Sequence, residues 1–290
     1  LLPKGQINFS LHSPIGNDTP RHAALLRLYA RMIIEQLNEF SYPAYLAGLN
    51  YTLATDDRGL SVQIGGFTDK QQLLLDKIFA AIEQPELSEQ RFERLKRELI
   101  RQSENADKQQ PYRRLMNVLP ELIYQNNWSD QQLLSAYQSI TLDQLDKYSQ
   151  DFMQSMTAKM LVYGNYSRQQ ALKLGATIEV AGDSSNTAVN ILALPSSEFS
   201  YQVSSPYTDA VLAFYIQASG LDKTTRAAMG VTSQFLRADF FNELRTEKQL
   251  GYVVTSGAYP VRDVPGIFFL VQSPVASVHR LQKEINGFIE

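Results

Sequence analysis

The sequence predicts an α+β fold of two homologous domains, each an antiparallel sheet with helices packed on one face. The main observation is an internal repeat in which strand, helix, β-hairpin and helix follow one another twice. Adding 204 to residues 7–18 leads to 211–222, so that Gly16 matches Gly220 and Asp18 matches Asp222. After a short insertion the offset is 207, and 59–82 matches 266–289. The chain therefore contains two copies of one unit.

The first copy is expected to begin with a strand from Ile7 and to continue into a helix that ends at Asn38-Glu39. A helical region follows the hairpin and the second helix, with shared apolar faces at Phe92, Leu95, Leu99, Leu115, Val118, Leu119 and Leu122. Thr141 and Gln144 have the spacing of a capping box that opens one more helix. The strand 159–163 then closes the unit.

In the second copy, a helix is predicted to pass almost directly into a strand. The three- and four-residue spacing predicts one buried helix face, made of Ala228, Val231, Phe235, Ala238 and Phe241. The alternation of Leu250, Tyr252 and Val254 indicates the strand. Arg245 is thus expected near the helix end and Tyr252 near the strand start. Ordinary explanations exist for both, since the helix dipole favours an Arg there and a Tyr packs with its hydroxyl in water.

The repeat also predicts the domain organisation. The first domain is expected at 1–178, a linker at 179–195, and the second domain at 196–290. The repeat arithmetic indicates that the second domain is incomplete, with roughly 80 residues of its helical part beyond Glu290. The opening Leu1-Leu2-Pro3 leads directly into a strand, so we expect a fragment of a longer protein.

Composition narrows the function classes. The net charge of −3 provides no basic surface for nucleic acid, and no apolar run approaches the roughly 18 residues of a membrane helix. The absence of Cys excludes disulfides, thiolate nucleophiles and Cys-ligated zinc, and it fits either the cytoplasm or an oxidising periplasm. His12, His22 and His279 lack the i, i+4 spacing that puts two zinc ligands on one helix face. We therefore expect this chain to hold no metal.

Three segments carry a family resemblance: 37–51, 66–71 and, most specifically, 244–252 with Arg245 and Tyr252. They resemble the insulinase/pitrilysin-type (M16) zinc metallopeptidases, in the catalytically silent C-terminal half of the enzyme. The resemblance implies a half-shell of a zinc-dependent endopeptidase that encloses and cleaves unfolded peptides. The zinc ligands would lie in the N-terminal M16 half of the same polypeptide, so this fragment alone should be inactive.

The resemblance also implies roles for two residues. Arg245 and Tyr252 would be catalytic, reaching the zinc site to bind the peptide and the oxyanion that develops on its carbonyl. The implied partners are peptide substrates and the N-terminal half, without nucleic acid or membrane insertion. The expected location is periplasmic, with the cytoplasm as the alternative.

A non-catalytic function remains open. M16-like folds also serve as structural or partner subunits, of the processing-peptidase or respiratory core-protein type. The presence of Arg245 and Tyr252 favours the peptidase, and an intact His-x-x-Glu-His motif upstream would decide between the two.

Overall fold

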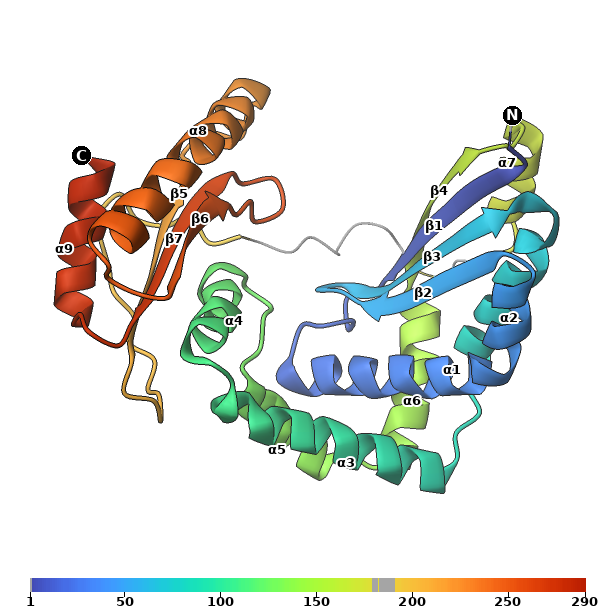
Figure 1. Ribbon diagram of the computed structural model, residues 1–290. Helices are drawn as coiled ribbons and strands as arrows, with labels where there is room; N and C mark the ends of the chain where they lie inside the picture. The colour runs from blue at the N-terminus through green and yellow to red at the C-terminus, as the bar shows by residue number, and fades with distance from the viewer. Residues whose placement is uncertain (1, 179–181, 183–190) are drawn as a thin grey trace. The chain divides into compact units, whose positions relative to one another are not determined.

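The computed structural model describes residues 2–178, 182 and 191–290 (Figure 1). The chain divides into two compact units, which we call unit 1 (Leu1–Glu104 and Trp128–Val189) and unit 2 (Asn105–Asn127 and Asn190–Glu290). The segment 105–127 thus packs with unit 2, although it precedes the end of the repeat's first copy. Most of the expected linker, 179–181 and 183–190, lies outside the described residues. The domain boundaries 1–178 and 196–290 stay a prediction.

Unit 1 contains a four-stranded antiparallel sheet with the strand order β2-β3-β1-β4. Its inner face is apolar, because Ile7, Phe9 and Leu11 alternate with more polar residues along the first strand. The strands are β1 (Lys4–His12), β2 (Leu49–Thr55), β3 (Gly59–Phe67) and β4 (Thr157–Gly164).

The helices of unit 1 are α1 (Pro20–Leu46), α2 (Gln71–Glu83), α3 (Glu89–Asn105), α5 (Asp130–Ser139), α6 (Leu142–Ser155) and α7 (Arg168–Gly175). The first begins at Pro20, and the Thr19 side chain accepts the His22 N–H as an N-cap. The expected end at Asn38-Glu39 is wrong, because the helix continues past Pro43 to Leu46. Gly48 then turns the chain into β2 with a φ of 74°. The predicted capping box of Thr141 and Gln144 is confirmed.

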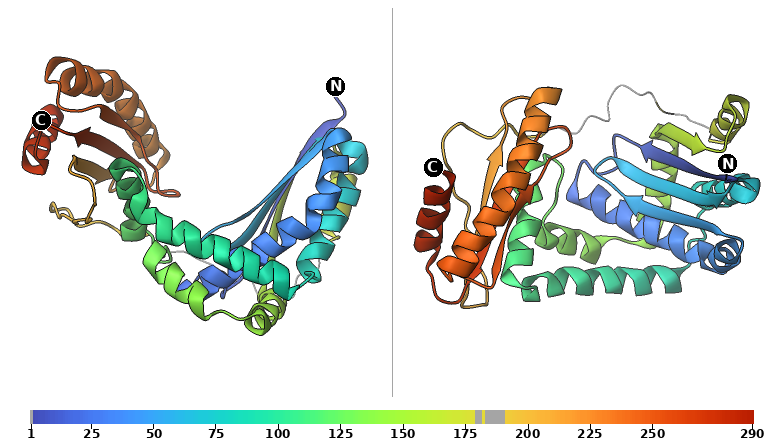
Figure 2. Two further views of the ribbon diagram at one scale, coloured as in Figure 1. Left: turned by 60° about the horizontal axis from the view of Figure 1, so that its bottom comes forward. Right: turned by 45° about the horizontal axis from the view of Figure 1, so that its top comes forward.

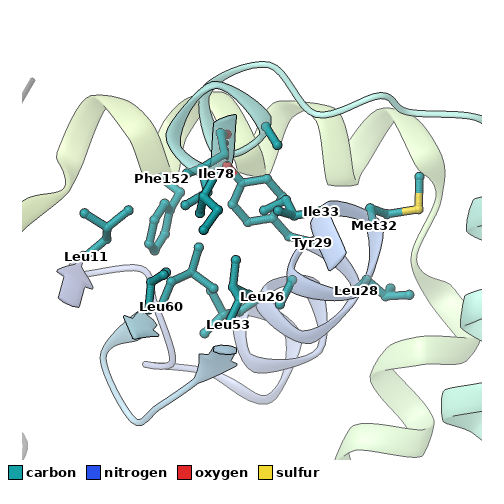
Figure 3. Close-up of a cluster of buried hydrophobic side chains, with 14 of the residues drawn as sticks. Leu11, Leu26, Leu28, Tyr29, Met32, Ile33, Leu53, Leu60, Ile78 and Phe152 are labelled. Atoms are coloured by element: carbon teal, nitrogen blue, oxygen red, sulfur yellow. Dashed lines mark hydrogen bonds between the residues drawn. The ribbon is translucent and has the colours of Figure 1, made fainter. Parts of the chain in front are cut away.

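The core of unit 1 lies between the sheet and α1, α2 and α6 (Figure 3). Leu11 and Leu60 come from the strands, Tyr29 and Ile33 from α1, and Phe152 from α6. Tyr29 is fully buried, and its hydroxyl donates a hydrogen bond to the Ile82 carbonyl at the end of α2. Aromatic packing of Tyr29 against Phe152 joins α1 to α6.

Unit 2 contains a three-stranded antiparallel sheet with the order β5-β7-β6. Its strands are β5 (Ala210–Gln217), β6 (Val253–Ala258) and β7 (Gly266–Ser273). This order corresponds to β1-β3-β2 in unit 1, so the predicted repeat of strand, helix, hairpin and helix is confirmed.

The strand register corrects the single offset of 204. Leu11 pairs with Leu60 in unit 1, and Ile216 pairs with Ile267 in unit 2. Since Ile267 follows Leu60 by 207 residues, Ile216 follows Leu11 by 205. The N-cap, by contrast, moves by 203, from Thr19 to Asp222. The loop between strand and helix is therefore two residues shorter in unit 2, and 204 pairs residues that are one position out of step.

The helices on one face of the second sheet are α8 (Lys223–Phe241) and α9 (Val278–Ile289) (Figure 2). The predicted buried face of α8 is wrong, because Val231 is 55% and Phe235 is 75% exposed. Phe240 is instead fully buried against Phe269 and Phe288, with ring centroids 5.1 and 5.2 Å away. Apolar residues occur on both sides of α8, and the sheet takes the other side.

The helix α4 (Pro111–Ile123) packs against β5 and β7. In the first turn of α4, the Tyr112 backbone N–H donates to the Gln272 side chain. Gln272 follows the core residue Val271 along β7, so the two side chains point to opposite faces of the sheet. The helix α4 therefore lies on the face of the sheet opposite α8 and α9 (Figures 1 and 2). The second sheet thus has helices on both faces, one of them from the sequence of the first copy. No helix in the described ranges is both long and apolar enough to cross a bilayer.

Candidate functional site

The junction that carries Arg245 and Tyr252 begins with a π-helical turn, Asn242–Glu247, directly after α8. Buried side chains anchor the junction within the turn and after it, since Leu244 and Leu250 are almost fully covered. The Leu250 N–H also donates to the Leu244 carbonyl at 2.9 Å. Between them, Gln249 has a left-handed φ of 50°. Arg245 thus lies close to the helix end, as predicted.

Tyr252 comes directly before β6, which starts at Val253. Gly251 allows the chain to approach the neighbouring strand, because a side-chain carbon at this position would lie 2.0 Å from the Gln272 carbonyl oxygen. The close approach brings Tyr252 beside the end of β7, with its side chain 49% exposed.

The Tyr252 hydroxyl is part of a hydrogen-bonded group that we call the Tyr252 cluster: Tyr252, Asp209, Gln272 and Tyr112. The phenol donates to Asp209 Oδ2 at 2.6 Å. Gln272 Nε2 donates to the same carboxylate oxygen at 2.9 Å and also to the phenol oxygen. Gln272 Oε1 accepts the Tyr112 backbone N–H at 3.2 Å. The cluster therefore combines the start of α4, the residues directly before β5 and β6, and the end of β7.

These contacts change the acidity of both ionisable partners. The hydrogen bond to Asp209 raises the pKa of the Tyr252 phenol, since the charged carboxylate stabilises the protonated ring. The hydrogen bonds from Tyr252 and Gln272 lower the pKa of Asp209. Near neutral pH the cluster therefore holds a protonated phenol beside a carboxylate.

Arg245 meets Tyr252 through the main chain. Its guanidinium Nη1 donates to the Tyr252 carbonyl, and the guanidinium lies over the Phe241 ring, 5.4 Å from the centroid. The contact to the ring is a cation–π interaction. The two predicted residues therefore lie together at one helix-to-strand junction, with the cation directed to the backbone and the phenol to the carboxylate.

The histidines do not fit a zinc site. His12 Nε2 lies 3.6 Å from Asp56, and His22 Nδ1 lies 2.7 Å from Asp18. Each thus has one carboxylate nearby, whereas a catalytic zinc takes three protein ligands. Among the described residues, no group of three His, Asp or Glu side chains could hold a metal ion. That the chain binds no zinc stays a prediction.

Sequence reasoning missed Asp209, Gln272 and Tyr112. One signal was present, because Gln272 follows the apolar run 267–271 and would be expected in the same strand. A buried carboxamide at a strand end needs partners and so indicates a polar cluster. Tyr112 had no such signal, since its contribution is a backbone N–H that depends on where α4 packs.

The chain matches two family models. Residues 1–136 match the middle or third domain of M16 peptidases, and residues 231–290 match domain 4 in the C-terminal lobe of PqqF-like PQQ synthases. The insulin-degrading enzyme of Drosophila melanogaster is 29% identical over 284 residues, which cover 93% of this chain and 29% of the enzyme.

Two solved structures show a similar fold. Pitrilysin superposes with a TM-score of 0.86 at 23% identity, over 99% of this chain and 31% of pitrilysin. A peptidase M16 inactive domain from Pseudomonas fluorescens has a TM-score of 0.65 at 16% identity, over 94% of this chain and 69% of that domain. The chain is similar to the M16 insulinase family of peptidases, and the matches lie in the C-terminal half of that family's enzymes. The predicted α+β fold is confirmed.

Proposed function

We propose that this chain forms the C-terminal half-shell of a zinc-dependent endopeptidase that encloses and cleaves unfolded peptides. Similarity to the M16 family supports this proposal, although the chain spans only 29% of the Drosophila relative. The zinc ligands would come from the N-terminal half of the same polypeptide. A periplasmic location stays part of the proposal.

The arrangement of Tyr252 and Arg245 carries the proposal. A half-exposed phenol lies at a junction anchored by the buried Leu244 and Leu250, and a guanidinium is bound to the Tyr252 carbonyl. The phenol O–H can exchange Asp209 for a developing oxyanion, to which it would donate its hydrogen bond. The guanidinium can bind a peptide carbonyl through its planar fork of donors. A non-catalytic subunit would not require this chemistry.

Tyr252→Phe in the full-length peptidase tests the proposal. The ring remains and one hydroxyl is lost, so kcat should fall by roughly 10- to 1,000-fold, the range for removing one preorganised donor. KM and zinc content should barely change. The matched control is Tyr207→Phe, which removes a hydroxyl of unit 2 that bonds the Lys108 carbonyl and should leave kcat unaltered.

Arg245→Lys provides a second test of the proposal, because Lys keeps the positive charge and lacks the planar array of guanidinium donors. A similar fall in kcat would support peptide binding by Arg245. The catalytic proposal is defeated if Tyr252→Phe keeps the wild-type kcat at saturating peptide, measured where the chemical step limits turnover. The non-catalytic alternative would then be preferred.

A further inference from the structure

We infer that Asp209 and Gln272 are positioning residues that aim the Tyr252 hydroxyl and keep it in its donor form, and that α4 orients Gln272 for this task. The inference rests on the proposed function for its effect on catalysis. Its structural part concerns only the Tyr252 cluster and can be tested without activity.

The first step is the direction of the Gln272 carboxamide. A backbone N–H can only donate, so the bond from Tyr112 identifies the atom it reaches as the amide oxygen. The amide nitrogen must then face Asp209 and Tyr252. Gln272 is 1% exposed, which leaves its side chain little room to turn. The first turn of α4, where helix N–H groups lack partners within the helix, thus sets the orientation of Gln272.

The second step is the direction of the phenol proton. The Tyr252 oxygen accepts a hydrogen bond from Gln272, so its own proton is directed to the remaining partner, Asp209. A side chain held by two bonds at its tip loses much of the rotational freedom of an exposed tyrosine. The phenol has one proton, so it donates to an oxyanion only after it leaves Asp209, and the bond from Gln272 then still holds the phenol oxygen in place.

The third step is the protonation state. Only the neutral phenol can donate a hydrogen bond, and the neighbouring carboxylate disfavours its ionisation. Other groups near the phenol are Tyr112 on α4 and Arg245 on the preceding turn. Arg245 bonds the Tyr252 carbonyl, and Asp209 is the group that bonds the hydroxyl. Asp209 therefore extends the pH range in which Tyr252 remains a donor beyond the ordinary value of about 10.

The test substitutes Asp209→Asn, which keeps the shape and removes the charge. Titration of the Tyr252 ring by NMR, with carbon-13 at the ζ position of tyrosine, should give a pKa above about 10 in the wild type and a lower pKa in the variant. Asp263→Asn is the matched control, because Asp263 pairs with Arg226 on the same unit and should leave the Tyr252 titration unchanged. An unchanged Tyr252 titration in Asp209→Asn would overturn the inference.

Kinetics of the full-length peptidase provide the second readout. Asp209→Asn should lower kcat by about tenfold, because a neutral amide holds Gln272, and through it the phenol oxygen, less firmly than the carboxylate does. It should also shift the alkaline limb of the pH profile to lower pH. In a Tyr252→Phe background the same substitution should have no further effect, because Asp209 acts through the hydroxyl. An equal loss in both backgrounds would contradict the positioning role.

The two experiments separate the two ideas. If Tyr252→Phe leaves kcat unchanged, the proposed function fails, while the NMR titration still decides whether Asp209 controls the phenol. If the Tyr252→Phe enzyme is impaired and the titration of Asp209→Asn is unaltered, the catalytic proposal stands and the positioning role is wrong.

Discussion

Three strands have the same order in units 1 and 2, but the first helix is buried on two sides in unit 1 and on one side in unit 2. The helix α1 is buried on two sides, since Leu28 and Met32 point away from Leu60 and the other strand residues and are still covered (Figure 3). The helices α5 and α6 pack against it. The counterparts of Leu28 and Met32 on α8, 203 residues later, are the exposed Val231 and Phe235. The sheet-facing side of the helix is therefore the common property of the two copies, and the other side depends on further helices.

The passage from helix to hairpin is the second difference between the units. In unit 1 only Ala47 and Gly48 separate α1 from β2. In unit 2 a π-helical turn and five further residues, 248–252, lie between α8 and β6. The longer passage places Arg245 and Tyr252 at the surface without changing the order of the strands. A repeat can thus keep its core while one copy gains a candidate site at a junction.

The largest expected effect concerns the two sides of α8. Phe240→Ala should lower the free energy of unfolding of unit 2 by about 3–5 kcal/mol, because it leaves a cavity beside Phe269 and Phe288. Phe235→Ala, on the exposed side of the same helix, should change it by less than about 0.5 kcal/mol. Urea denaturation followed by hydrogen exchange in β7 would measure both. Equal losses would show that α8 is buried on both sides, as α1 is.

An intermediate effect is expected at Gln71, the buried glutamine of unit 1. Gln71 in unit 1 donates to the carbonyls of Gly5 and Gly66 and accepts from the Tyr166 hydroxyl, so its carboxamide bonds within the core. Gln71→Ala leaves these groups without their partner and should cost about 1–3 kcal/mol.

Hydrogen exchange of the β1 and β3 amides would measure this loss. Gln63→Ala, an exposed glutamine on β3, is the control and should have little effect. Protection factors that stay at the wild-type level in Gln71→Ala would mean that Gln71 is as dispensable as a surface residue.

The smallest effect concerns Lys248, which links the π-helical turn to α9 through Glu243 at 2.6 Å and Glu284 at 2.8 Å. Its side chain is partly exposed, so Lys248→Met should cost only about 0.2–1 kcal/mol. The hydrogen bonds to Glu243 and Glu284 raise the pKa of Lys248, and the bond from Lys248 lowers the pKa of Glu284.

These shifts define the pH range of the contribution. It is present above the ordinary Glu pKa of about 4.3 and is lost as pH falls through the lowered pKa of Glu284. It is also lost as pH rises through the raised pKa of Lys248. Thermal melts of the wild type and Lys248→Met should therefore differ near neutral pH and converge in acid. A difference that persists below the Glu284 pKa would indicate a packing effect instead.

Much of the fold could be predicted because strands and helices have their own periods. The alternation in β1 and the capping box at Thr141 are local signals, and the repeat put the same elements in order a second time. The candidate site was predicted only for its contiguous part, Arg245 and Tyr252, which lie seven residues apart. Asp209 and Gln272 come from distant positions, and only strand pairing brings them to the phenol.

The sequence by itself determined the element types, the two-copy order and the motif that carries Arg245 and Tyr252, because each depends on neighbours along the chain. Tertiary structure alone decided which side of α8 is buried, since apolar residues at helical spacing occur on both sides and the sheet can cover only one. It also decided that α4 joins unit 2. Both outcomes depend on which surfaces meet in space, and the free energy of burying them has no signature in the local spacing of residues.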